Sequence, residues 1–111
     1  KDKTEIITYF KADEKVEIPD GVQKISDNAF GYKNTIKNIT IPDSVKDIGH
    51  SFYYCGGLTN ITIPNSVEKI HTDCFNNCNY LIQINIDNTK NSISGAPWGS
   101  PYGMRVINWL R

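Results

Sequence analysis

The chain has 111 residues, with 12 basic and 12 acidic side chains and a formal net charge of zero. This length fits a single domain. The balanced charge argues against a surface built for nucleic acid or for anionic membranes, because both need concentrated positive charge. No apolar run approaches the roughly 18 residues of a membrane-spanning helix, so we expect no membrane insertion.

At the start of the chain, residues 6–10 (Ile-Ile-Thr-Tyr-Phe) have the β-branched and aromatic composition of a strand. A polar turn over residues 11–15 follows and leads to Val16. We expect residues 1–15 to form an N-terminal cap for the repeat that begins at Val16.

A short cassette then occurs three times. Ile-Thr-Ile-Pro-Asp-Ser-Val at 39–45 recurs as Ile-Thr-Ile-Pro-Asn-Ser-Val at 61–67, and an earlier copy, Val-Glu-Ile-Pro-Asp-Gly-Val, occupies 16–22. The copies are 23 and then 22 residues apart. A fixed period of this size is typical of solenoids, in which each coil buries its apolar face against its neighbours.

Each copy predicts one coil. The Ile-x-Ile pattern has the period-two alternation of a strand, and the proline ends the strand because it lacks a ladder donor. The Pro-Asp or Pro-Asn pair turns the chain, and Val-x-x-Ile begins a second short strand. The segment around Phe30, Phe52 and Phe75 is too short for an α-helix, so we expect a turn or a single 3₁₀ turn there. The middle copy lacks one residue between Ile48 and Phe52.

The pattern changes after the third copy. Residues 81–86 predict a fourth strand, after which Asp87 replaces the proline of the earlier copies. Gly-Ala-Pro-Trp-Gly at 95–99 forms an aromatic loop, and residues 105–110 predict a last edge strand. We expect Trp98 and Trp109 to cover the open apolar end of the stack.

The whole chain is thus predicted to be one module of three to four coils. Its parts are the N-terminal cap (1–15), the repeat coils (16–86) and a C-terminal cap (87–111).

Residues 58–78 follow the pattern Leu-x-x-Ile-x-Ile-Pro-x-Ser-Val-x-x-Ile-Gly-x-x-Ala-Phe-x-x-Cys, except that His71 replaces the glycine and Cys74 replaces the alanine. This pattern resembles the BspA-like (bacterial surface protein A-like) leucine-rich repeat. The resemblance extends over 16–86 and departs from the pattern at Lys33, where the repeat has a cysteine, and in the shortened middle copy. It implies a right-handed leucine-rich-repeat solenoid of β-rich α/β class, with two short strands per 22–23-residue coil and little helix.

The resemblance also implies a secreted or cell-surface bacterial protein with a role in adhesion. The family has no common catalytic residues, so none transfers to this chain. We therefore expect a non-enzymatic module without cofactor or metal, which binds a host or matrix protein or a glycan and forms a monomeric part of a larger chain. The alternative is a structural spacer that positions neighbouring domains and has no ligand of its own.

The first predicted binding surface is the outward side of the main strands. Polar side chains that alternate with buried isoleucines would form a regular hydrogen-bonding platform, suited to an extended glycan or peptide. They could equally be no more than a solvated ladder. The residues are Glu17, Thr40, Thr62 and Asn85, flanked by Asn38, Asn60 and Gln83.

The second predicted surface is a tyrosine cluster that follows the Phe positions, formed by Tyr32, Tyr53 and Tyr54. Tyrosine is enriched in binding surfaces because it offers rigid, amphipathic contact area. The competing interpretation is that these rings pack over the turns that carry the phenylalanines.

The three cysteines, Cys55, Cys74 and Cys78, are an odd number and cannot all pair with one another. With His71 they could be drawn as a four-ligand zinc site, but buried cysteine behaves as a small apolar residue. A disulfide between Cys55 and Cys78 is conceivable across stacked coils, although side chains stacked in parallel seldom reach the required dihedral angle. A nucleophilic Cys–His pair would need an orienting group and an oxyanion site, for which no motif is present. We expect three reduced, buried thiols.

Overall fold

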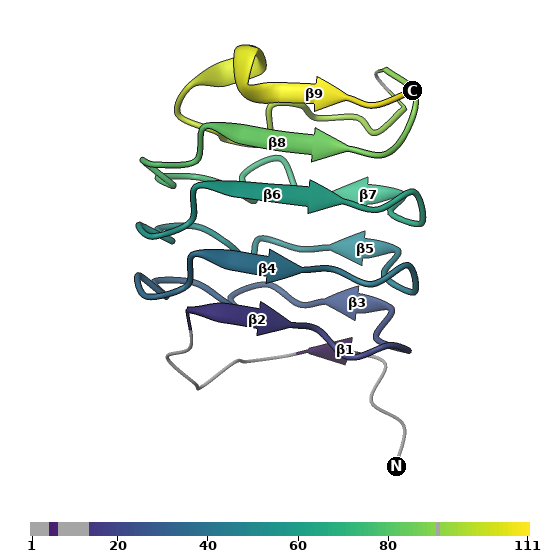
Figure 1. The fold of residues 1–111 in the computed structure, drawn as a ribbon, viewed down its shortest axis with the longest axis horizontal. Helices are drawn as coiled ribbons and strands as arrows, with labels where there is room; N and C mark the ends of the chain where they lie inside the picture. The colour runs from purple at the N-terminus through teal and green to yellow at the C-terminus, as the bar shows by residue number, and fades with distance from the viewer. Residues whose placement is uncertain (1–4, 7–13, 91) are drawn as a thin grey trace.

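The computed structural model describes residues 5–6, 14–90 and 92–111. The chain winds into a right-handed solenoid of about four turns, with strands on two opposite walls (Figure 1). The predicted fold class is confirmed. The first strand (Glu5–Ile6) begins one residue before the predicted segment 6–10 and shares Ile6 with it. Residues 7–13, which hold the rest of that segment and most of the predicted turn, lie outside the described residues.

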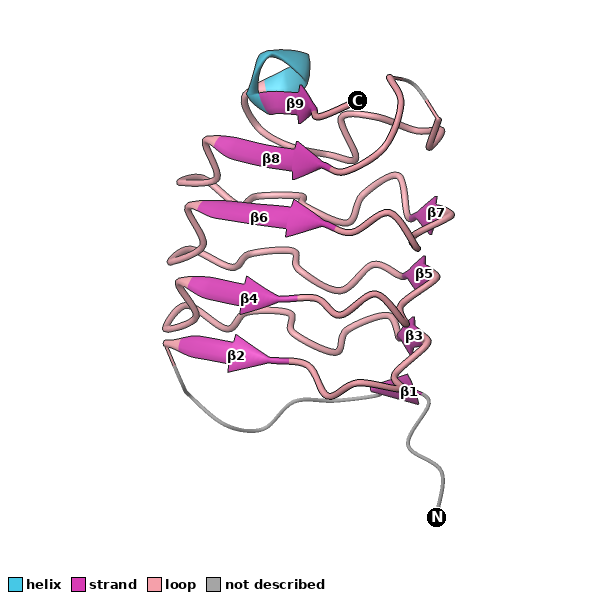
Figure 2. Ribbon diagram, turned by 45° about the vertical axis from the view of Figure 1, so that its right-hand side comes forward, coloured by secondary structure: helices cyan, strands magenta, loops and turns pink. Residues whose placement is uncertain are grey.

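The front wall of the solenoid is formed by the strands of the Ile-x-Ile pattern and by the last strand of the chain. These are β2 (Lys15–Glu17), β4 (Asn38–Thr40), β6 (Asn60–Ile63), β8 (Gln83–Ile86) and β9 (Ile107–Trp109). The back wall carries two-residue strands: β1 (Glu5–Ile6), β3 (Lys24–Ile25), β5 (Asp47–Ile48) and β7 (Lys69–Ile70). Figure 2 shows that loops join the two walls and that the 3₁₀ helix at Gly103–Val106 lies beside β9.

All strand pairs among the described residues are parallel, and equivalent residues of successive copies are paired. Ile61 lies opposite Ile84, which in turn lies opposite Ile107. The back wall is one continuous sheet in the order β1-β3-β5-β7. The front wall is divided, because β2 pairs with β4 and β6 pairs with β8 and β9, whereas β4 and β6 are not joined by a hydrogen-bonded ladder. The front wall therefore consists of two sheets.

Alternation along the front strands builds the core. Ile61 and Ile63 are buried and Thr62 between them is exposed, as the period-two pattern predicts. The phenylalanines stack behind them: Phe30 and Phe52 have ring centroids 5.3 Å apart and an interplanar angle of 8°. The segments that carry these rings are turns, as expected.

The serine of the Pro-x-Ser motif joins successive coils through hydrogen bonds to the backbone. The hydroxyl of Ser44 donates to the carbonyl of Val22 in the preceding coil at 2.7 Å and accepts a hydrogen bond from the N–H of Gly21 at 3.0 Å. Ser66 repeats the first contact with the carbonyl of Val45 at 2.6 Å. These bonds satisfy backbone groups at the turn and hold successive coils in register.

The C-terminal end of the stack is covered by tryptophan. Trp98 is fully buried, its indole N–H donates to the carbonyl of Ser94 at 2.8 Å, and its ring meets Trp109 edge-to-face at 6.1 Å. The predicted last strand over 105–110 is too long: residues 103–106 form a 3₁₀ helix (Gly103–Val106), and the strand is only β9. Gly103 has a φ of 69°, a left-handed conformation that lets the chain turn into the helix.

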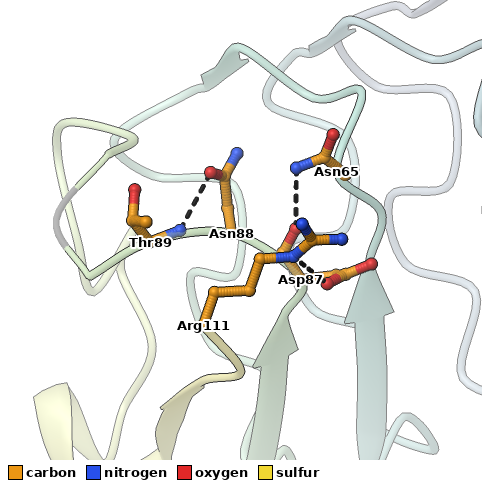
Figure 3. Close-up of polar contacts among 5 residues, drawn as sticks. All are labelled: Asn65, Asp87, Asn88, Thr89 and Arg111. Carbon is orange, nitrogen blue, oxygen red and sulfur yellow. Dashed lines mark hydrogen bonds and ion pairs between the residues drawn. The ribbon is translucent and has the colours of Figure 1, made fainter.

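Asp87, which replaces the proline of the earlier copies, ties the last coil to the end of the chain (Figure 3). Its carboxylate forms an ion pair with the Arg111 guanidinium at 2.8 Å, and its backbone carbonyl accepts a 3.2 Å hydrogen bond from the Asn65 amide. No helix in the described part of the chain is long and apolar enough to cross a membrane.

Candidate functional site

The residues predicted for the sheet face do lie together on the outward side of the front wall. Glu17 is paired in register with Thr40, and Thr62 with Asn85. Thr40 and Thr62 are exposed, whereas Asn85 is half-buried. The flanking side chains Asn38, Asn60 and Gln83 are exposed as well.

On the part of this face that belongs to β8 and β9, the polar side chains form hydrogen bonds with one another. The amide oxygen of Asn85 accepts hydrogen bonds from the side-chain amides of Gln83 and Asn108, both at 3.2 Å. Asn108 was not among the predicted residues. In the sequence, Asn108 lies in the predicted last strand at the position equivalent to Asn85 in the preceding strand. The repeat is weak at the end of the chain, so this equivalence was not recognised.

The part of the face between β4 and β6 is open. A hollow of about 410 Å³ lies where the front sheet is divided, and Asn38, Thr40, Asn60 and Thr62 line it. The side chains of Asn38, Thr40 and Thr62 make no hydrogen bond within the part of the chain that the structure describes. A ligand could therefore use these groups without breaking existing contacts.

Two carboxylates that were not predicted as binding residues, Asp43 and Asp87, also line this hollow. The ion pair with Arg111 lowers the pKa of Asp87 below its ordinary value (Figure 3). The charge of the Asp87 carboxylate is balanced by Arg111, whereas Asp43 has no ion-pair partner among the described residues.

The tyrosines divide into an exposed pair and a supporting ring. Tyr32 and Tyr54 stack with ring centroids 5.0 Å apart and an interplanar angle of 8°. Tyr53 is half-buried and meets Tyr32 edge-to-face at 5.3 Å, and its hydroxyl donates to the Asn28 side chain. Burial raises the pKa of Tyr53 above its ordinary value. Tyr53 thus packs over the turn, as the competing interpretation held, while Tyr32 and Tyr54 reach solvent.

A second hollow, of about 450 Å³, lies on the back wall and was not predicted. Lys24, Asp47 and Lys69 line it and occupy paired register positions, so charges of opposite sign alternate along the ladder. His71 also lines it, and its Nδ1 accepts a 3.0 Å hydrogen bond from the N–H of Asp73.

The cysteines are free and fully buried in the structure. The thiol of Cys55 donates to the carbonyl of Phe30 at 3.1 Å, and the thiol of Cys78 donates to that of Phe52 at 2.7 Å. Burial raises the pKa of the Cys74 thiol. No group of three metal-ligating side chains occurs among the described residues, and His71 is exposed at the surface while the cysteines are not. The cysteines serve the packing of the coils.

Stacked parallel coils with an aliphatic core and regularly spaced outward polar residues define a leucine-rich-repeat solenoid. The family described as the BspA type leucine rich repeat region matches residues 8–97 in six copies. The chain belongs to this family, which confirms the resemblance seen in the sequence. Searches of curated proteins and of solved structures found no match to the chain.

Repeats of this family are protein-interaction modules, and the solenoid is typically a non-catalytic binding scaffold. Proteins of the family are typically secreted or located at the bacterial surface.

Proposed function

We propose that the protein is a non-catalytic adhesion module of an extracellular bacterial protein and that it binds a host or matrix polypeptide or glycan on its front wall. The observation that carries the proposal is the 410 Å³ hollow between β4 and β6, which is lined by amide and hydroxyl groups of two successive coils. The unused side chains of Thr40 and Thr62 are its central groups.

The fixed positions of these two threonines support a binding role for this surface. Thr40 and Thr62 project from strands whose neighbouring residues are buried, so their positions are fixed before any ligand arrives. Binding to a pre-ordered surface loses less conformational entropy than binding to mobile side chains. Groups that repeat at the spacing of the coils suit a ligand that is itself extended.

The test is binding of the chain to a panel of matrix proteins, mucins and glycans, beside the variant Thr40→Ala/Thr62→Ala. We expect the wild type to bind at least one member and the variant to lose that binding with its fold intact. A matched control is Thr72→Ala/Thr89→Ala, which removes two exposed threonines outside the front-wall hollow. Equal binding by the wild type and by the front-wall variant would contradict the proposed site.

A second candidate function is that of a spacer without a ligand. The hydrogen bonds that Asn85 receives from Gln83 and Asn108 favour it, because these side chains satisfy one another along the ladder. A chain that binds no member of the panel would support the spacer and would move the search for a ligand to neighbouring domains.

A further inference from the structure

Four exposed tyrosines lie along one edge of the solenoid. The segments that lead into β4, β6, β8 and β9 all run along the same side of the molecule, at the left of Figure 1. Each carries an exposed tyrosine, and the hydroxyl of the last, Tyr102, donates to the carbonyl of Asn79 at 2.8 Å, in the turn that holds Tyr80. The exposed fractions are 66% for Tyr32, 45% for Tyr54, 67% for Tyr80 and 41% for Tyr102. The sequence had pointed only to the first two.

The backbone at the first two of these residues is unusual. Tyr32 and Tyr54 each follow a buried phenylalanine by two residues and have φ of 62° and 56°. The equivalent residue of the next coil, Asn77, has a φ of 60°. Asparagine tolerates this left-handed conformation, whereas a bulky aromatic residue is disfavoured in it.

The fold therefore does not require tyrosine at these two positions, since the third coil makes the same turn with asparagine. Residues kept in a disfavoured conformation cluster at sites of function. Two such tyrosines whose rings project into solvent are thus better explained by a ligand than by the turn itself.

The exposed pair is also held in place. Tyr53 meets the rings of Tyr32 and Tyr54 edge-to-face, with interplanar angles of 87° and 86°, and is anchored by its hydrogen bond to Asn28. The hydroxyls of Tyr32 and Tyr54 make no hydrogen bond within the described part of the chain. The pair is a pre-ordered aromatic surface with two unused phenol groups.

The chemistry of this edge indicates the kind of ligand. The four segments, residues 31–37, 53–59, 76–82 and 99–106, contain no carboxylate, and their charged residues are Lys33, Lys37 and Arg105. Their other polar residues are mainly asparagine, threonine and serine. The C–H-rich face of a pyranose ring packs on an aromatic ring, and its hydroxyls pair with phenols and amides.

A folded or helical polypeptide fits less well at this edge. Neither of the two hollows described above is lined by these tyrosines. An apolar side chain of a protein partner at this edge would therefore enter neither hollow, whereas stacking on a projecting ring needs no pocket.

We propose that the Tyr32–Tyr54 pair is a stacking site for a pyranose ring of a linear glycan, whose chain continues along the edge toward Tyr80 and Tyr102. This inference rests on the proposed function as a binding module; it narrows the ligand to a linear glycan and adds a second binding surface beside the front wall. The three cations of the edge make acidic glycans the stronger ligands within this class.

The experiment is a titration of the chain with linear hexasaccharides, in which binding is measured by calorimetry and by saturation-transfer NMR. The probes are xylohexaose and mannohexaose as neutral chains and a hyaluronan hexasaccharide as an acidic chain. The test variant is Tyr32→Asn/Tyr54→Asn, which keeps residues suited to the left-handed backbone, and the matched variant Tyr32→Phe/Tyr54→Phe keeps the rings. Thermal unfolding of each variant checks that its fold is intact.

We expect the wild type to bind, with saturation transfer to tyrosine-facing C–H groups, and the Asn variant to bind about tenfold more weakly or worse. The Phe variant is expected to bind within about threefold of the wild type, since stacking on the ring dominates. No binding of any hexasaccharide, or equal binding by the Asn variant, overturns the inference. The front-wall variant Thr40→Ala/Thr62→Ala separates the two proposals: if it alone loses a ligand of the wider panel, the proposed function stands and the tyrosine site falls.

Discussion

The carboxylate of Asp27 accepts a 2.7 Å hydrogen bond from the backbone N–H of His50, which lies one coil further along the stack. His50 belongs to the shortened copy, and the backbone carbonyl of His50 in turn accepts a 2.8 Å hydrogen bond from the N–H of Asn28. A side chain thus supplies a contact between coils at the place where the copy lacks one residue. The neighbouring Gly49 makes this possible, because a Cβ there would overlap the Asp27 carboxylate and the Asp27 backbone nitrogen.

The first prediction concerns Gly49. We expect Gly49→Ala to destabilise the fold by about 1–3 kcal/mol, since the added methyl group must displace Asp27 and its coil. Urea unfolding followed by circular dichroism measures the change. In the double variant with Asp27→Ala the two effects should not add, because the residues share one contact. Strict additivity would show that the close approach does not cause the loss.

The second prediction concerns the register of the front strands. Ile63→Asp places a charge without a partner in the core and should unfold the module, whereas Thr62→Asp should leave it folded. Far-UV circular dichroism and the dispersion of NMR amide signals distinguish the two outcomes. The reverse result would mean that the isoleucines of this strand face solvent and that Thr62 faces the core.

The third prediction concerns the serine of the Pro-x-Ser motif. Ser44→Ala removes both a donor to the Val22 carbonyl and an acceptor for the Gly21 N–H, so we expect a loss of about 1–2 kcal/mol. Ser66→Ala, which removes only the recorded bond to Val45, should cost less, about 1 kcal/mol. Denaturant midpoints of the two variants give the comparison, and a larger loss for Ser66→Ala would contradict it.

The fourth prediction concerns pH. The Arg111 ion pair lowers the pKa of Asp87 below its ordinary value of 3.8 in the folded protein. The stability that this pair contributes is therefore present above pH 4 and is lost as the pH falls through the folded-state pKa. We expect the stability difference between the wild type and Arg111→Gln to be constant at neutral pH and to shrink in acid as the Asp87 carboxylate becomes protonated. NMR titration of the Asp87 carboxyl carbon should show that the pKa rises in the variant.

The fifth prediction concerns the thiols. Cys55, Cys74 and Cys78 are fully buried, so a reagent cannot reach their sulfur atoms in the folded protein. Burial raises the pKa of Cys74, whereas the hydrogen bond with the Cys55 thiol lowers the pKa of Cys78, so Cys78 is protected by exclusion of the reagent. We expect no reaction of the folded protein with a thiol-specific disulfide reagent at neutral pH, and reaction of all three thiols in urea. Rapid reaction of a thiol before unfolding would show that the coils open locally.

Much of the fold could be predicted because each coil repeats a local pattern. The alternation of Ile61, Thr62 and Ile63 determined which side chains enter the core, and repetition of that pattern determined which strands pair. The end of the chain was harder, because residues 103–106 lack the repeat and a left-handed glycine begins a 3₁₀ helix there.

The candidate site was predictable only in part. The column position of Thr40 and Thr62 follows from the pattern, but the hollow between them depends on the missing ladder between β4 and β6, which no local pattern encodes. Tyr80 and Tyr102 could not be predicted from the repeat, because they are not at the positions equivalent to Tyr32 and Tyr54. Only the winding of the chain brings their segments to the same edge of the solenoid.

The divided front wall also has a mechanical consequence. Among the described residues, the coils of β4 and β6 are joined by a strand ladder only at the back wall, through β5 and β7. A tensile force applied along the stack would therefore separate the front of these two coils first, while β5 and β7 act as a hinge. The front of this joint coincides with the proposed binding hollow, so tension along the stack and occupancy of the hollow by a ligand would be coupled.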